Sequence, residues 1–216
     1  MSASTPGTTP IAVDLAAVAP EDAARARWYG LFASLFRAPP TAGWLAAIAT
    51  SAGRAGCADD DRPLGYAWND FAGACAQADA GAVREEFDTA FLGVGKADVI
   101  PYASYHLSGF LNDRPLIELR GHLAQLGLAR RADIGETEDH LSALCETMAW
   151  LIAGDAGQVR DFATQRAFFS RFLAPWYDAF AETIEHSGVT DFYKHAGRLL
   201  REFLAIERQG FEFDSP

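Results

Sequence analysis

Apolar side chains recur every three to four residues along most of this chain, the spacing that places them on one face of an α-helix. The clearest example runs from Leu141 to Ile152 and is closed by Gly154. Other segments with this spacing lie at about residues 28–36, 44–48, 64–75, 83–92, 115–126, 162–180 and 192–204. No segment alternates convincingly with the period of two that is typical of a strand. The pattern predicts an all-α fold, a single-domain helical bundle.

Prolines and glycines mark where these helices begin and end. The proline pair at 39–40 should stop the first helix, and Pro115 should start another that Gly127 ends. In the long aromatic segment at 162–180, Pro175 predicts a bend. Residues 93–105 contain two glycines and a proline, and this composition predicts an irregular loop between helices.

The domain boundaries follow from composition. Residues 1–20 are rich in Ser, Thr, Pro and Ala, which predicts a flexible N-terminal tail, and residues 21–210 then form one all-helical domain. The acidic stretch at 53–63 predicts a solvated loop. The N-terminus lacks a basic region, and no run of about 18 uncharged apolar residues occurs. These features predict a cytoplasmic protein without a membrane span.

Charge and cysteine content narrow the possible partners. The 18 Lys and Arg residues face 29 Asp and Glu residues, for a formal net charge of -11. Nucleic-acid binding requires the opposite sign, so the balance argues against it and suits either simple solubility or a cationic partner. The three cysteines show no CxxC pairing, which favours reduced, buried thiols over a disulfide framework.

The densest polar cluster is Glu136-Thr137-Glu138-Asp139-His140, immediately before the Leu141 helix. One interpretation is a helix N-terminus, with Thr137 as N-cap and the acids after it in the first turn. The other is a binding site, because an Asp-His pair at the edge of a core can offer donors and acceptors to a polar guest. The residues alone leave both interpretations open.

A second cluster precedes it in the chain. Phe87 and Phe91 share a helix face, where core packing is the default expectation, and Gly93 follows them. Pro101 and Tyr102 stand in the predicted loop, where an aromatic side chain after a rigid proline can line a groove.

Enzyme signatures are weak. No His-Glu-x-x-His motif occurs, and no Glu is followed three residues later by His. Residues 90–97 resemble a phosphate-binding loop, but Ala90 replaces its first glycine and Ala97 its Ser or Thr.

Three motifs stand in a fixed order: an aromatic-x-x-x-Phe-x-Gly helix end at 87–93, Pro-aromatic-x-Ser at 101–104, and Glu-x-x-Asp-His at 136–140. Together they resemble the TorD/DmsD family of redox-enzyme maturation chaperones, and the likeness extends over about residues 25–207. One departure is Thr137, which stands where the family usually has proline, and this change should alter the geometry of Glu136 more than that of Asp139 and His140.

The resemblance implies an all-helical cytoplasmic chaperone and not an enzyme. Such a protein binds the twin-arginine signal peptide, or the apoprotein, of a molybdenum-cofactor oxidoreductase until cofactor insertion is complete. The resemblance implies no resident cofactor or metal. It does allow weak binding of guanine nucleotides. Neither nucleic-acid binding nor stable membrane insertion is expected, and the choice between monomer and homodimer is open.

Applied to this chain, the resemblance assigns the peptide arginines to carboxylates, which pair well with guanidinium groups. The expected peptide-binding residues are Asp139, His140, Glu136, Glu138, Pro101, Tyr102, Ser104, Phe87, Phe91 and Gly93. Asp139, Glu136 and Glu138 would receive the arginines, and His140 would shape that site. Pro101, Tyr102 and Phe91 would contact the apolar part. The rival hypothesis is a metal- or nucleotide-binding helical enzyme that uses Glu136, Asp139 and His140.

Overall fold

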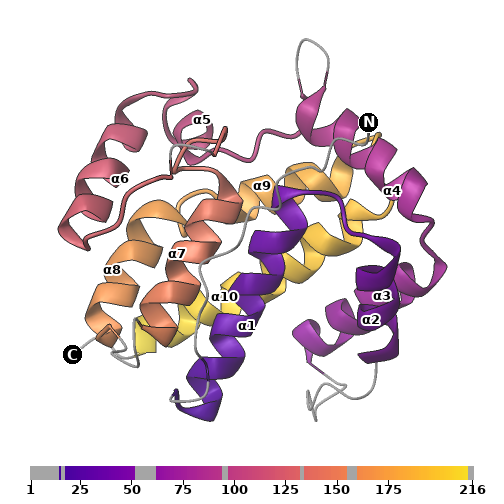
Figure 1. Ribbon diagram of the computed structural model, residues 1–216, viewed down its shortest axis with the longest axis horizontal. Coiled ribbons are helices and arrows are strands. Elements are labelled where there is room, and N and C mark those ends of the chain that lie inside the picture. The colour runs from indigo at the N-terminus through magenta and orange to yellow at the C-terminus, as the bar shows by residue number, and fades with distance from the viewer. Residues whose placement is uncertain are drawn as a thin grey trace, which may run out of the picture.

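The computed structural model describes residues 15, 18–51, 62–93, 97–131, 134–154 and 160–213. Within these ranges the chain is helical and forms no strand, which confirms the all-α prediction (Figure 1). The elements are α1 (Pro20–Arg37), α2 (Ala42–Ser51), α3 (Pro63–Gln77), α4 (Ala80–Phe87), the π-helical η1 (Asp88–Leu92), α5 (Ala103–Ser108), α6 (Arg114–Gln125), α7 (Leu141–Ala153), α8 (Phe162–Phe172), α9 (Tyr177–His186) and α10 (Tyr193–Phe213).

Helix α7 is the most buried element of the bundle. Of its residues, only Ala143 and Glu146 are partly exposed, because α1 packs along α7 and α8 packs beside it. Figure 1 shows α1 and α7 side by side near the middle of the molecule, with α10 crossing behind them. A helix that is apolar on nearly all faces is expected at such a central position.

Aromatic rings join α1 to α10. Phe203 of α10 lies 5.0 Å from Tyr29 and 5.7 Å from both Trp28 and Phe32, measured between ring centroids. Nearer the start of α10, Gly197 allows a close approach to α9, since a Cβ there would lie 3.0 Å from Ile184 Cγ2. The core therefore depends on large rings around the middle of α10 and on a missing side chain near its start.

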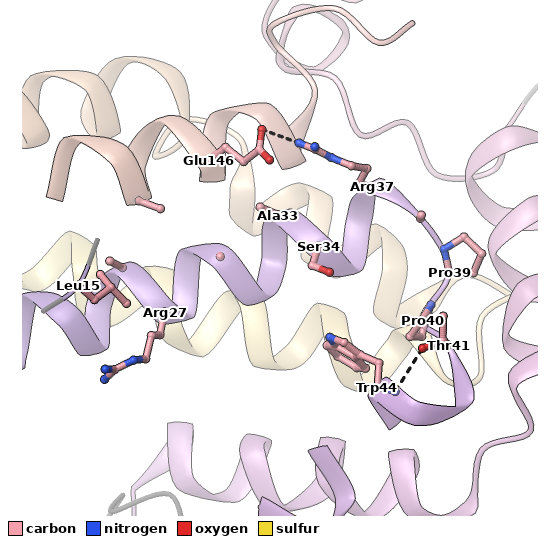
Figure 2. Close-up of a pocket in the computed structure, with 14 residues that line it drawn as sticks. Leu15, Arg27, Ala33, Ser34, Arg37, Pro39, Pro40, Thr41, Trp44 and Glu146 are labelled. Carbon is pink, nitrogen blue, oxygen red and sulfur yellow. Dashed lines mark hydrogen bonds and ion pairs between the residues drawn. The ribbon is translucent and has the colours of Figure 1, made fainter. Parts of the chain in front are cut away.

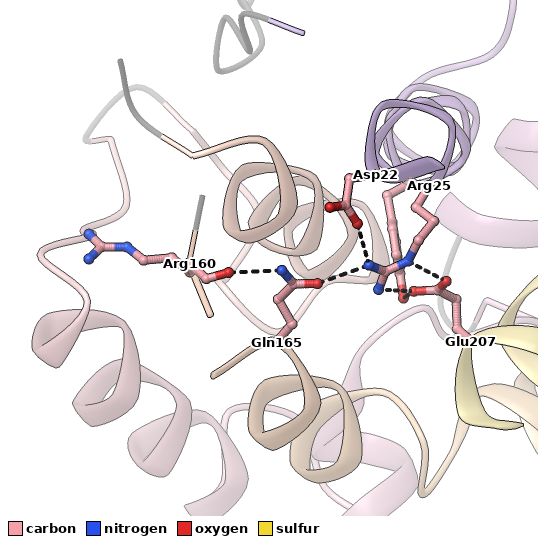
Figure 3. A network of polar contacts seen from close by, with 6 residues as sticks. Asp22, Arg25, Arg160, Gln165 and Glu207 are labelled. Atoms are coloured by element: carbon pink, nitrogen blue, oxygen red, sulfur yellow. Dashed lines mark hydrogen bonds and ion pairs between the residues drawn. The ribbon is translucent and has the colours of Figure 1, made fainter. Parts of the chain in front are cut away.

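A polar network ties α1 to α8 and α10 (Figure 3). Arg25 of α1 donates through Nε and Nη2 to the two carboxylate oxygens of Glu207, at 2.8 and 2.9 Å. Its Nη1 also donates to Asp22 and to Gln165 of α8. The Tyr29 hydroxyl donates to Glu207 at 3.1 Å, so the buried carboxylate has charged and neutral partners.

Some boundaries differ from the prediction. The aromatic segment at 162–180 is two helices, because α8 ends at Phe172 and α9 begins at Tyr177. The loop predicted at 93–105 ends earlier than expected, since α5 begins at Ala103. The acidic stretch at 53–63 and the N-terminal tail fall largely outside the described residues, and the described part of the tail already includes the start of α1.

Candidate functional site

Two motifs that lie far apart in the sequence meet in the fold. Tyr102 and His140 form an isolated antiparallel bridge, in which Ala103 N donates to Asp139 O at 3.0 Å and Leu141 N to Pro101 O at 2.8 Å. Helix α5 begins directly after Tyr102 and α7 directly after His140. The bridge therefore fixes two helix N-termini against each other and joins the Pro101 and His140 blocks into one site.

Asp139 is buried and serves as an internal link in this site. Its Oδ2 accepts a 2.9 Å hydrogen bond from the backbone N–H of Ser104, in the first turn of α5. Its Oδ1 accepts a 2.6 Å hydrogen bond from the Thr137 hydroxyl. Both oxygens therefore have partners within the chain, and the burial of the side chain keeps a guest from contacting them directly.

His140 is the N-cap of α7, so the expectation that Thr137 caps this helix is wrong. The His140 Nδ1 accepts from Ser142 N at 3.1 Å and lies 3.0 Å from Ser142 Oγ. A neutral ring that accepts at Nδ1 carries its proton on Nε2. Burial lowers the pKa of His140 to about 4, and the positive charge of Arg37 acts in the same direction, while Glu136 and Asp139 oppose it. The ring is therefore neutral at neutral pH.

Tyr102 lies against this histidine and is half-buried. The two rings meet edge to face with centroids 4.9 Å apart. Burial raises the pKa of Tyr102, and the nearby carboxylates of Glu136 and Asp139 raise it further. The phenol is therefore protonated at neutral pH and can donate a hydrogen bond.

The two remaining acids differ in their surroundings. Glu138 is bound by Arg120, with Nη2 at 2.9 Å, and lies 3.8 Å from Nε of Arg130. Glu136 is exposed to solvent. Since Asp139 and Glu138 already have partners, Glu136 is the carboxylate of this cluster most open to a guest.

The aromatic pair at 87 and 91 lies in the core. Phe87 and Phe91 are buried, with ring centroids 5.7 and 5.0 Å from that of Tyr193. Gly93 ends η1, and Val99 N donates to Ala90 O at 2.9 Å, which holds the chain leading to Pro101 against η1. A peptide could touch these rings only if the core opened, so the expectation that Phe87 and Phe91 bind the peptide is wrong for this structure.

A pocket that sequence reasoning missed lies between α1, α2 and α7 (Figure 2). Its volume is about 410 Å³, and it is lined by Leu15, Ala26, Arg27, Gly30, Ala33, Ser34, Arg37, Ala38, Pro39, Pro40, Thr41, Trp44, Glu146 and Ala149. Arg37 and Glu146 form a 2.5 Å ion pair on its wall. The small residues Gly30 and Ala33, one turn apart on α1, are the sequence signal for this hollow.

Two further features concern the rival hypothesis and membranes. Within the described ranges, no three His, Cys, Asp or Glu side chains gather as metal ligands would, and no helix is long and apolar enough to span a bilayer. Of the segment that resembles a phosphate loop, residues 94–96 lie outside the described part of the chain.

Comparison with known proteins gives a consistent result. Residues 57–182, more than half of the chain, match the model of the family described as nitrate reductase delta subunit. The chain is 30% identical over 130 residues to the chaperone protein TorD of Aliivibrio fischeri, an alignment that covers 56% of this chain and 60% of that protein. It is 32% identical over 131 residues to TorD of Vibrio cholerae, which covers 57% of this chain and 59% of that one. The chain thus spans less than two thirds of the length of these curated relatives.

A solved structure has the same fold. It is a proposed redox enzyme maturation protein from Archaeoglobus fulgidus, with a TM-score of 0.58 and 21% sequence identity. The superposition covers 84% of this chain and 93% of that one.

Proposed function

We propose, from the premise that the chain belongs to the nitrate reductase delta subunit family, that it is a cytoplasmic chaperone for a molybdenum-cofactor oxidoreductase. The proposed client is the twin-arginine signal peptide, or the apoprotein, of that enzyme, held until its cofactor is inserted. The TorD relatives are named chaperones, which supports the general role.

The observation that carries the proposal is the bridge between Tyr102 and His140. It places an exposed carboxylate, Glu136, beside a half-buried aromatic ring at the surface of the bundle. A twin-arginine peptide has a basic segment followed by an apolar one, so its receptor requires an acid next to apolar surface. In this proposal Glu136 receives an arginine, and the Tyr102 ring contacts the residues after it.

The buried residues have supporting roles in this proposal. The negative charge of Asp139 lies behind Glu136 and adds to the attraction for a guanidinium group, while His140 fixes the position of Tyr102. Glu138 would reach a peptide arginine only by exchanging one of its own arginine partners.

The test is a calorimetric titration with a synthetic peptide that carries two adjacent arginines followed by an apolar run of about 12 residues. Glu136→Gln should weaken binding by about 1.5–3 kcal/mol, the range for a hydrogen bond to a charged group. Glu21→Gln is the matched control, because Glu21 is exposed and lies far from the site. It is at the start of α1, about 24 Å along the helix from Arg37, and Arg37 is the residue of α1 whose charge acts on His140.

A wild-type protein that fails to bind this peptide would contradict the proposal, and equal losses in Glu136→Gln and Glu21→Gln would contradict the assigned site. Stoichiometric metal in the purified protein would instead favour the rival enzyme. Weak guanine nucleotide binding stays a prediction that the same calorimeter can test.

A further inference from the structure

We infer that three exposed side chains, those of Leu107 in the last turn of α5 and of Phe110 and Leu111 in the connection to α6, form the docking surface for the apolar segment of the client peptide. We call residues 107–111 the apolar loop. The inference rests on the proposed function and deepens it, since it separates the residues that contact the apolar part from those that contact the arginines.

The first argument is exposure. Phe110 is 71% exposed, Leu111 50% and Leu107 37%, all within five consecutive residues. Ile117 of α6 adds a fourth exposed apolar side chain at 66%. Other large exposed apolar residues of the described chain are spread over α3, η1, α10 and the connection before α10. Single exposed apolar residues are ordinary, whereas a group of them marks an interaction site.

The second argument is that the backbone of the apolar loop is specifically constrained. Gly109 has φ +84°, and Asn112 has φ +60°, the one positive value for a non-glycine residue in the described ranges. Ser108 Oγ donates to Ser104 O at 2.8 Å and contacts Phe110 O at 3.3 Å. Glycine and asparagine are the residues that adopt left-handed backbone most readily, so Gly109 and Asn112 allow the tight turn that the Ser108 hydrogen bonds hold.

The third argument is the connection between the apolar loop and the acidic block. Asn112 N donates to the hydroxyl of the buried Ser104 at 3.2 Å, and Ser104 N donates to Asp139 Oδ2 at 2.9 Å. A continuous chain of hydrogen bonds therefore runs from Thr137 through Asp139 and Ser104 to the end of the loop. In this inference Asp139 and Ser104 are positioning residues that fix where Phe110 and Leu111 stand.

These connections favour a peptide as the occupant. The hydrogen bond from Asn112 returns the loop to the N-terminal end of α5, where Tyr102 and the 136–140 segment lie. An exposed acid, a half-buried ring and an apolar loop are thus joined around the short helix α5, as a guest with a basic part followed by an apolar part requires. A second copy of this chain carries a formal net charge of -11 and would repel the acidic block overall, which favours a cationic peptide over self-association.

The experiment compares two peptides against three proteins. One peptide carries two arginines and an apolar run of about 12 residues; the other keeps the arginines but has serine and glycine in place of that run. The proteins are the wild type, Phe110→Ser/Leu111→Ser, and the control Ile206→Ser/Phe213→Ser, whose side chains are 48% and 89% exposed on α10. All four replaced side chains are about half exposed or more, so the substitutions should leave the core intact. Circular dichroism verifies that each variant folds.

We expect Phe110→Ser/Leu111→Ser to weaken binding of the apolar peptide about tenfold or more, because apolar burial contributes most of its affinity. Its affinity for the polar peptide should equal that of the wild type, and the control should match the wild type with both peptides. Ser104→Ala, which frees the Asn112 N–H, should weaken binding of the apolar peptide selectively.

Unchanged affinity of Phe110→Ser/Leu111→Ser for the apolar peptide would overturn the inference while leaving the proposed function intact. A variant that changes the molecular mass in solution, with unchanged affinity, would overturn it in favour of a self-association surface. A wild type that binds neither peptide would overturn the proposed function and the inference with it.

Discussion

At the scale of single residues, His140 combines three structural tasks. It caps α7 through Nδ1, pairs with Tyr102 through the backbone, and packs its ring edge to face against the Tyr102 ring. A protonated imidazole could not accept the Ser142 N–H at Nδ1 and would place a charge in a buried site. The site is therefore built around the neutral form of this histidine.

This arrangement predicts how stability depends on pH. The pKa of His140 is about 4 in the folded chain against 6.5 for an unperturbed histidine, so between these values the unfolded state binds more protons. The contribution is fully present above pH 6.5 and falls as the pH drops toward 4, by roughly 3 kcal/mol in total. An NMR titration should find the His140 ring neutral down to about pH 4. A midpoint near 6.5 would show that the ring is not buried as described.

Asp139 allows a test that separates charge from hydrogen bonding. Asp139→Ala leaves the Ser104 N–H without its acceptor and should lower the free energy of unfolding by about 1.5–3 kcal/mol in urea titrations. Asp139→Asn keeps an acceptor oxygen and should cost clearly less. Equal losses in the two variants would mean that the negative charge, and not the acceptor, stabilises the N-terminus of α5.

At the scale of elements, periodicity predicted the helices well and the site only in part. The Leu141 helix was predicted with nearly its observed bounds because its apolar residues are continuous and Gly154 ends it. The caps were harder, since Asp139 caps α5, a helix 35 positions earlier in the chain, and no local pattern shows such a contact. The break between Phe172 and Tyr177 was expected only as a bend, because a proline does not show how far a helix is interrupted.

The contact between α9 and α10 predicts different effects for two glycines of α10. A side chain at Gly197 would meet Ile184 at 3.0 Å and the Ala181 carbonyl at 3.3 Å, whereas Gly210 has no atom within 4 Å. Gly197→Leu should therefore lower the free energy of unfolding by about 1–3 kcal/mol through overpacking. Gly210→Leu should be neutral or slightly stabilising, since leucine favours the helix. Equal effects in thermal or urea unfolding would contradict the close approach.

At the scale of the whole molecule, the first and last helices are locked together by Arg25 and Glu207. The pair joins residues 182 positions apart, and Gln165 extends the network to α8 (Figure 3). The order of the bundle therefore depends on a polar contact as well as on the aromatic core.

The network predicts an asymmetry between its two partners. Arg25→Met leaves Glu207 buried with only the Tyr29 hydroxyl as a partner, which should cost about 3 kcal/mol or more. Glu207→Leu should cost less, because Arg25 keeps Asp22 and Gln165. The double variant should lose less than the sum of both, as a double-mutant cycle in urea would measure.

The exposed ion pair between Lys194 and Asp191 provides the control for this network. Lys194→Met should change the free energy of unfolding by about 0.5 kcal/mol or less, as expected for a surface pair. A cost for Arg25→Met no larger than this would show that the buried pair contributes little.

The burial of α7 predicts how a bound client would change hydrogen–deuterium exchange in the bundle. The residues at the start of α7 are buried, so we expect their amide hydrogens to exchange with deuterium chiefly when the bundle opens as a whole. A ligand bound at the N-terminal end of α7 should therefore not act by slowing a local opening there. Its affinity should instead appear as slower deuterium uptake throughout α1, α7 and α10 at once, by an amount set by its occupancy.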